Sequence, residues 1–387
     1  KATITPTVDI PEGNVTAKAT DPSGNVSEPS EPAKATTPGT TTPDTEAPAK
    51  PVVNTDLTGK AGTKTPVEVN AEPGSKVELF DKDGKKIGEA TAGKDGKATI
   101  TPTVDIPAGN VTAKATDPAG NTSDASDPKV ATPAAPVVTP TIPATANNMP
   151  GAGVSSTDKT ISGTGTPGAT VTIKSGNNTL VENVPVGADG TWTATLPKGL
   201  NSNITTQPQL TPKDKVTVTQ TLNGVPSAET EVPVGLGETV IQPDEKSSDK
   251  QSLIEATKTI TVKVPHDAGM AYLGYTNKDT NKAGEVALKR DSIDGPWYAK
   301  DESKAVVKSY ATDGFTDTIV LEMKEPVKEG KAKAIANIVE GKYSSPVGWK
   351  EINVEAKQPT DADKNTPTAK EQTVNKGETP DAKKSIG

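Results

Sequence analysis

The sequence predicts an all-β protein in which small β-sandwich domains follow one another along an elongated rod. First, residues 1–22 return as residues 97–118 with one difference, Glu12 against Ala108, so the repeat is 96 residues long (97 − 1). Second, short stretches of alternating apolar residues are bounded by turn signals such as Asp-Gly and Asn-Gly. Third, the chain has 35 prolines and only 3% aromatic residues, which favours several narrow cores joined by linkers over one large core.

The pattern divides the chain into consecutive parts. We expect the second half of a repeat (1–36), a Pro/Thr-rich linker (37–48), a complete repeat (49–132), a diverged repeat (136–240), a polar linker (241–256), an aromatic-rich sandwich (257–356) and the truncated start of a further repeat (357–387). The first linker has no apolar periodicity, and its prolines are expected to keep it extended. This order of parts is typical of a piece of a longer tandem array.

The complete repeat carries several strand candidates, each bounded by a turn signal: 67–69, 76–80, 86–91, 97–101 and 110–116. Proline presets φ at the second position of a turn, and glycine supplies the positive φ that ends it. Short alternating strands with a turn every 8–12 residues or so are typical of a β-sandwich of immunoglobulin type. Because the chain has no cysteine, the disulfide-centred core of antibody domains is excluded.

The diverged repeat keeps the turn spacing of the complete repeat. The glycines of its Pro-Gly and Asp-Gly turns are 22 residues apart (168 to 190), as they are in the complete repeat (74 to 96). Extra residues near 198–212 are expected to form a surface loop. Asn223-Gly224 then joins two strand candidates, and both residue types accept the positive φ of a type I′ hairpin turn.

Composition excludes most catalytic chemistry. The chain has no cysteine and a single histidine, His266, so thiolate metal sites and histidine-based catalytic pairs are excluded. No Ser or Thr has the neighbouring base that a nucleophile requires. We therefore expect a protein that is not an enzyme and has no cofactor, with His266 as an ordinary loop residue.

Charge and hydropathy restrict the partners. The net charge is −8, with acidic and basic residues interspersed, which argues against nucleic acid or an anionic membrane surface as a partner. The sequence also lacks a run of about 18 apolar residues, so no membrane insertion is expected for these residues.

Four aspartates are the candidates for a metal site. Asp81 and Asp83 lie in one Asp-Gly turn, and Asp117 and Asp124 lie near the end of the complete repeat. Clustered carboxylates suit calcium because it is a hard cation. Solvated turn carboxylates are the simpler interpretation, and calcium that stiffens the array is the alternative.

Aromatic residues are concentrated in one part of the chain, because eight of the ten lie in residues 257–356. Either they fill a larger core, or some of them form a recognition surface, where Tyr and Trp are enriched. In the second case Tyr272, Tyr275 and Trp349 are the residues that we expect to be exposed and to bind a ligand.

Several motifs resemble the bacterial Ig-like repeats of Gram-positive surface adhesins: Ala47–Val53, Glu72–Val77, Lys94–Thr99 and Thr116–Asn121. The tail is similar to the start of a Rib/alpha-type repeat, in the segments Asp361–Thr368 and Val374–Pro380. The first resemblance covers about 1–240, and residues 257–356 match more loosely.

The resemblance implies a function as well as a fold. Proteins of this kind, including biofilm-associated surface proteins, are secreted and are anchored to the cell wall by a C-terminal sorting signal. It implies a non-enzymatic stalk and adhesive region whose partners are proteins or glycans on a host or neighbouring cell, or further copies of itself. The alternatives are a specific glycoprotein- or glycan-binding module centred on residues 257–356, and a calcium-stiffened array.

Overall fold

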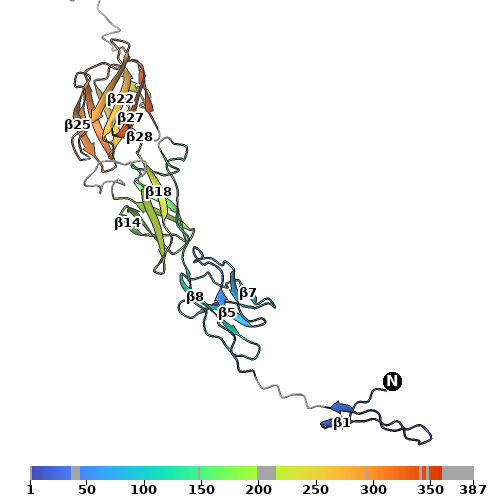
Figure 1. Cartoon of the computed structure of the whole chain (residues 1–387). Helices are drawn as coiled ribbons and strands as arrows, with labels where there is room; N and C mark the ends of the chain where they lie inside the picture. Colours follow the sequence, from blue (N-terminus) through green and yellow to red (C-terminus); the bar gives the residue numbers. More distant parts are fainter. Residues whose placement is uncertain are drawn as a thin grey trace, which may run out of the picture.

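The computed structural model describes residues 2–35, 44–146, 149–197, 215–292, 294–339, 342–345 and 348–359. These residues form strands and turns without any helix, and they build two-sheet sandwiches that follow one another along a common direction (Figure 1). The predicted all-β class with tandem sandwiches is confirmed. Outside the described residues lie most of the first linker (36–43), the extra loop (198–212) and the further repeat from residue 360 onward.

Sandwich 1, the complete repeat, packs a three-stranded sheet against a four-stranded sheet. The orders are β3-β4-β7 and β6-β5-β8-β9, and all neighbouring strands are antiparallel. The strands are β3 (Val52–Val53), β4 (Val67–Asn70), β5 (Lys76–Phe80), β6 (Lys86–Thr91), β7 (Lys97–Ile100), β8 (Gly109–Thr116) and β9 (Lys129–Ala131). Along β8, Val111, Ala113 and Ala115 are buried while the residues between them are not, as the two-residue period of a strand requires.

The half-repeat at the start of the chain keeps the strand register of sandwich 1. Its strands β1 (Gly13–Val15) and β2 (Ala33–Ala35) pair as β8 and β9 do, shifted by 96 residues (109 − 13). Its apolar side chains have nothing to pack against, since Ile10 is 53% exposed while its counterpart Ile106 is 1% exposed. Two strands without a partner sheet bury too little apolar surface to be stable alone.

Sandwich 2, the diverged repeat, has the orders β10-β12-β15 and β11-β18-β16-β13-β14, with β17 also paired to β16. The strands are β10 (Val137–Val138), β11 (Val154–Ser155), β12 (Thr160–Thr164), β13 (Thr170–Ser175), β14 (Asn178–Pro185), β15 (Thr191–Thr195), β16 (Lys215–Leu222), β17 (Val225–Pro226) and β18 (Thr230–Gly235). The predicted hairpin is confirmed, because Asn223 and Gly224 between β16 and β17 have φ values of 50° and 81°.

Sandwich 3 has the orders β19-β21-β26-β25 and β20-β29-β27-β22-β23-β24, with β28 also paired to β27. The strands are β19 (Val240–Ile241), β20 (Leu253–Ile254), β21 (Thr259–Pro265), β22 (Met270–Thr276), β23 (Ala283–Lys289), β24 (Tyr298–Ala299), β25 (Ala305–Thr312), β26 (Thr316–Met323), β27 (Gly330–Val339), β28 (Lys342–Ser344) and β29 (Lys350–Glu355).

The expectation of a separate linker at residues 241–256 is wrong. β19 pairs with β21 and β20 pairs with β29, so this stretch supplies an edge strand to each sheet of sandwich 3. Only residues 236–239 separate β18 of sandwich 2 from β19 of sandwich 3. The polar composition misled the prediction because two-residue strands leave little apolar signal in a sequence.

The hydrophobic interiors differ in how far they extend. The buried residues of sandwich 1, from Val53 to Ala131, form a cluster of their own. Those of sandwiches 2 and 3 form one continuous cluster from Val154 to Val354. The expectation that each sandwich seals its own interior therefore holds for sandwich 1 and is wrong for the other two, which the short connection at 236–239 holds in contact.

Candidate functional site

The first junction, between sandwiches 1 and 2, is built around one buried glutamine. Gln220 follows Val216 and Val218 at the inward positions of β16 and is 1% exposed. Its Nε2 donates to the Ala134 carbonyl at 2.5 Å and to Thr166 Oγ1 at 3.1 Å, and its Oε1 accepts the Thr166 N–H at 2.9 Å. A single side chain thereby ties the chain that leaves sandwich 1 to a loop of sandwich 2.

Close backbone approach completes the first junction. A Cβ at Gly62, in sandwich 1, would lie 2.4 Å from Cγ2 of Thr166 in sandwich 2, so this position requires glycine. Leu222 and Val225, on either side of the Asn-Gly turn, pack against the core of sandwich 1. A cavity of about 310 Å³ remains between the facing loops.

The second junction, between sandwiches 2 and 3, combines ionic and apolar contacts. Lys159 Nζ lies 2.9 Å from Asp313 Oδ2 and 5.4 Å from the centre of the Phe315 ring. On another part of the junction, Lys350 Nζ lies 2.8 Å from Glu238 Oε1. Exposed ion pairs contribute little by themselves, so the continuous apolar core carries most of the stability of this junction.

A buried polar cluster lies in sandwich 3 at the end of its core. Asp317 occupies an inward position of β26, where Ile319, Leu321 and Met323 follow it at the same face, and it is 1% exposed. A lone buried carboxylate would be costly, so its partners explain how it is tolerated.

Three side chains donate to Asp317. His266 Nδ1 lies 2.7 Å from Oδ1, and the ring N–H is the donor because an ionised carboxylate can only accept. Arg290 Nη1 and Trp297 Nε1 each donate to Oδ2 at 2.8 Å. Arg290 Nε also donates to the Ala268 carbonyl at 2.8 Å, and the guanidinium lies 4.9 Å from the centre of the Trp297 ring.

These contacts shift the pKa values of His266 and Asp317. The hydrogen bond to Asp317 raises the pKa of His266 against the opposing effect of its burial. Burial acts to raise the pKa of Asp317, but the hydrogen bonds from His266 and Trp297 and the charge of Arg290 outweigh it and hold that pKa below its usual range.

Asp267, the neighbour of His266, faces sandwich 2. It is 3% exposed, and neither carboxylate oxygen has a hydrogen-bond partner. The hydroxyl of Ser156, in sandwich 2, is the polar group that interacts with it across the junction. Burial raises the pKa of Asp267 to about 6, and the charges of His266 and Arg290 only partly offset that effect.

Sequence reasoning placed His266 in a loop but missed its burial. The loop between β21 and β22 does hold it, yet its side chain points into the polar cluster and not toward solvent. One signal was available: Arg290 is the only arginine among 42 basic residues, and the planar fork of arginine suits several acceptors at once.

The four aspartates predicted as a calcium site are not brought together. Asp81 and Asp83 follow the end of β5, whereas Asp117 and Asp124 follow β8 beside the start of β5, because Thr116 pairs with Lys76. The pair Asp81 and Asp83 and the pair Asp117 and Asp124 therefore lie at opposite ends of β5, a five-residue strand about 17 Å long.

Hydrogen bonds within turns account for two of these four carboxylates. Asp81 Oδ1 accepts the N–H groups of Asp83 and Lys85, and Asp117 accepts the N–H and the side-chain amide of Asn121. Within the described ranges no group of three or more Asp, Glu or His side chains could hold a metal ion. Calcium binding stays a prediction.

The aromatic candidates separate into core and surface. The expectation that Tyr275 is exposed is wrong. Its side chain is only 5% exposed, because it points inward from β22, a strand between β23 and β27. Its hydroxyl donates to Glu325 Oε2 at 2.6 Å, and burial raises its pKa. Tyr272 is half-buried, whereas Trp349 is 39% exposed with Lys333 Nζ 4.7 Å from its ring centre.

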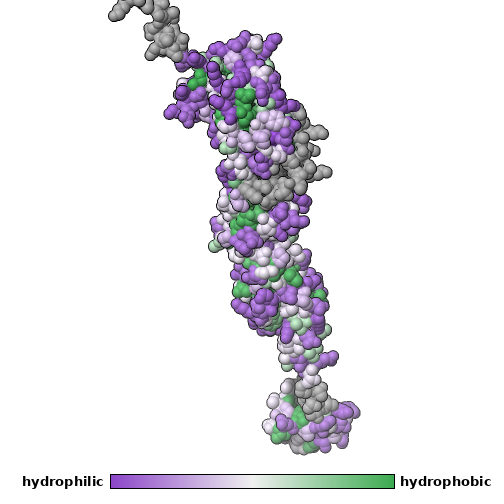
Figure 2. Space-filling model, turned by 90° about the vertical axis from the view of Figure 1, so that its left-hand side faces the viewer, coloured by the Kyte–Doolittle hydropathy of each residue, from purple (hydrophilic) through white to green (hydrophobic). Residues whose placement is uncertain are grey.

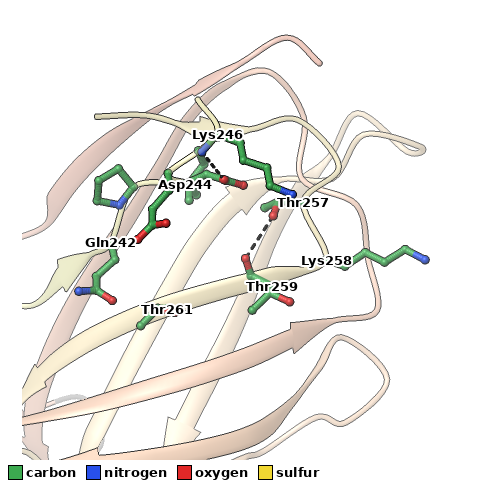
Figure 3. Close-up of a pocket in the computed structure, with 10 residues that line it drawn as sticks. Gln242, Asp244, Lys246, Thr257, Lys258, Thr259 and Thr261 are labelled. Atoms are coloured by element: carbon green, nitrogen blue, oxygen red, sulfur yellow. Dashed lines mark hydrogen bonds between the residues drawn. The ribbon is translucent and has the colours of Figure 1, made fainter. Parts of the chain in front are cut away.

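A polar pocket of about 430 Å³ opens at the edge of sandwich 3 (Figure 3). Threonine side chains of β21 line it together with Gln242, Asp244 and Lys246. The drawn contacts are local: Lys246 N–H donates to Asp244 Oδ1 at 2.9 Å, and Thr257 Oγ1 donates to the Thr259 carbonyl at 3.1 Å. The lining offers hydroxyl and charged groups but no nucleophile with a base beside it.

Comparison with known proteins agrees with the sandwich architecture. Residues 46–131 and 146–222 each match the family model described as Bacterial Ig domain. No curated protein matches this sequence. The predicted Ig-like sandwich class is therefore confirmed for both repeats. Among the described residues, no helix is long and apolar enough to cross a bilayer.

Three solved structures illustrate the likeness. The BSP domain of a biofilm associated protein is 19% identical, with a TM-score of 0.20, over 48% of this chain and 29% of that chain. Three N-terminal domains of the bacteriophage RB49 outer capsid protein Hoc are 10% identical, with a TM-score of 0.21, over 81% and 99%. SGBP-B of the Bacteroides ovatus mixed-linkage glucan utilization locus is 14% identical, with a TM-score of 0.21, over 81% of each chain. The match thus spans less than a third of the solved BSP-domain chain.

Proposed function

We propose that these residues form the non-enzymatic stalk and adhesive region of a bacterial cell-surface adhesin. In this role the chain holds a binding region away from the cell wall during cell adhesion or biofilm formation. The observation that carries the proposal is the end-to-end arrangement of sandwiches whose two junctions are both closed by buried contacts (Figure 1).

The mechanism needs no reaction. Each sandwich contacts mainly its neighbours, so the length of the molecule grows with the number of sandwiches. A rod resists collapse only when its junctions are stiff, and here Gln220 closes one junction while a continuous apolar core closes the other. The surface supports the same role, because apolar residues form only small, separate patches on the face shown in Figure 2.

Extracellular localisation and anchoring to the cell wall belong to this proposal. They rest on the resemblance of the repeats to surface adhesins and on the family match of residues 46–131 and 146–222. The proposed partners are proteins or glycans of a host or neighbouring cell, with self-association as a further mode.

Small-angle X-ray scattering of residues 1–387 tests the rod. We expect a distance distribution with a long tail, as for a cylinder. A matched variant with a flexible Gly-Ser insertion between Gly237 and Glu238 should lower the average radius of gyration, because sandwiches 2 and 3 can then bend relative to each other. A compact particle, or an insertion without effect, would contradict a stiff stalk.

A second candidate is a glycan- or glycoprotein-binding module centred on residues 257–356. The exposure of Trp349 favours it, because an exposed Trp ring can stack on a sugar or an apolar side chain. Replacing Trp349 with Ala should reduce adhesion of coated beads to cells, while replacing the equally exposed Tyr310 with Ala serves as the control. Equal adhesion of both variants and the unchanged protein would reject this candidate.

A further inference from the structure

The only histidine and the only arginine of the chain meet in one buried cluster. His266 and Arg290 both contact Asp317, and all three side chains are almost fully buried. A chain that uses lysine almost everywhere else places its single guanidinium where four groups converge on it: two carbonyls, a carboxylate and an indole ring. Such a concentration of rare side chains in one place requires a physical reason.

The cluster reaches the second junction through Asp267. This residue lies in the same loop as His266, and the hydroxyl of Ser156 faces it from sandwich 2. Ser156 is itself held in place, because its N–H donates to the Gly235 carbonyl and its Oγ accepts the Gly237 N–H at 3.1 Å. Asp267 is therefore enclosed by residues of both sandwiches.

Several charged groups surround Asp267 and His266. Asp267 experiences attraction from His266 and Arg290 and repulsion from Asp317. His266 faces Asp317 and Thr312 at Nδ1, lies 3.7 Å from Asp294 at Nε2, and also experiences Arg290 and Asp267.

These charges balance only when a proton is present. With Asp267 ionised and His266 neutral, one buried positive charge, on Arg290, faces two buried negative charges, on Asp267 and Asp317, and the exposed Asp294 adds a further negative charge at the rim. One proton, on either His266 or Asp267, restores neutrality. Asp267 is almost fully buried and the Ser156 hydroxyl offsets only a small part of the cost of that burial, so its ionised form is the costly one.

We propose that this cluster is a proton-operated latch that tightens the junction between sandwiches 2 and 3 in mildly acidic surroundings and loosens it in alkaline surroundings. Residues 236–239 connect the two sandwiches along the chain, and Ser156, which interacts with Asp267, accepts the N–H of Gly237 in this connection at 3.1 Å, so the connection can act as a hinge.

The direction of the effect follows from proton linkage. The pKa of Asp267 is raised from 3.8 to about 6, so the folded state takes up a proton and gains stability as the pH falls through about 6. The pKa of His266 is raised above 6.5, so its contribution is fully present below 6.5 and is lost as the pH rises through the raised value. Both groups therefore stabilise the junction at lower pH.

Two measurements test the latch. The first is thermal unfolding of residues 1–387 at about pH 7.5 and about pH 5, compared with the Asp267→Asn variant. The Asp267 contribution predicts a rise of the melting temperature of sandwiches 2 and 3 by roughly 3–6 °C at the lower pH. The variant should melt higher than the unchanged protein at pH 7.5 and should lose this part of the pH dependence.

The second measurement reports on the hinge. Because the chain has no cysteine, Lys174→Cys in sandwich 2 and Ser309→Cys in sandwich 3 can be labelled for single-molecule energy transfer. We expect the distance distribution to narrow from pH 7.5 to pH 5 in the unchanged protein and to be narrow at both values after Asp267→Asn.

The signal of the single histidine in a proton NMR titration provides a readout that needs no variant. We expect His266 to titrate above the pH of an exposed histidine. Titration of His266 at its ordinary pH, or an unchanged pH dependence of melting and hinge width in Asp267→Asn, would overturn the latch. A rod at pH 7.5 without any pH response would reject the latch alone and leave the proposed stalk intact.

Discussion

Removing the positive charge from the buried cluster should destabilise sandwiches 2 and 3 far more than removing an exposed charge. In Arg290→Met the guanidinium is replaced by an apolar side chain of similar length, and Asp317 keeps a negative charge inside the core. Breaking a buried pair in this way costs about 3–5 kcal/mol, because the remaining charge is left uncompensated. For a unit of roughly 200 residues, each kcal/mol lowers the melting temperature by about 2–4 °C.

The matched control is Lys331→Met in the same sandwich. Lys331 Nζ lies 2.6 Å from Glu351 Oε2, but the two side chains are 63% and 51% exposed. Such a surface pair contributes about 0–1 kcal/mol, so the control should melt within a few degrees of the unchanged protein.

Differential scanning calorimetry gives both values in one experiment. Because sandwiches 2 and 3 share one core, we expect a single transition for them, separate from that of sandwich 1. Arg290→Met should shift only the transition of sandwiches 2 and 3. Equal shifts for the two variants would show that the cluster contributes no more than a surface ion pair, and separate transitions for sandwiches 2 and 3 would contradict the shared core.

Three further predictions concern other parts of the chain. Gly62→Ala should loosen the first junction, because the added Cβ would meet Thr166. The control Gly74→Ala has a similar positive φ but open space around it, so it should cost only about 1 kcal/mol of backbone strain. Small-angle scattering should show a bent rod for the first variant and a straight rod for the second. Tyr275→Phe should cost about 1 kcal/mol in urea unfolding, because the buried hydroxyl no longer donates to Glu325, and a neutral result would mean that water replaces this bond. If calcium stiffens the array, chelation should lower the melting temperature, and an unchanged melt would end that alternative.

Turn chemistry and strand periodicity were sufficient to predict much of the fold. Asn223-Gly224 forms the expected hairpin because few residue pairs accept positive φ at both positions. The strands of sandwich 1 follow the alternation seen in the sequence, as in the buried Val111 of β8. Such local signals do not depend on partners that lie far away in the chain.

The candidate site was harder to predict because its hydrogen bonds and burial depend on residues that are distant in the sequence. Asp317 was not among the predicted site residues, although it stands at the first inward position of the alternation that continues with Ile319 and Leu321. Gln220 occupies a similar place after Val216 and Val218. At both positions the available signal was a polar residue at an inward-facing position of a strand. It was missed because the sequence does not show which distant groups form hydrogen bonds with that residue.

The sequence alone determined that this protein is a row of small β-sandwiches with no cysteine and a single histidine. Repeats, turn residues and two-residue periodicity are local properties, and each is written within a few neighbouring positions. The tertiary structure alone decided that sandwiches 2 and 3 share one core and that His266, Arg290 and Asp317 meet beside Asp267. The His266–Asp317 contact alone joins positions 51 residues apart, and the pairing of β26 with β21 brings these two residues within hydrogen-bonding distance.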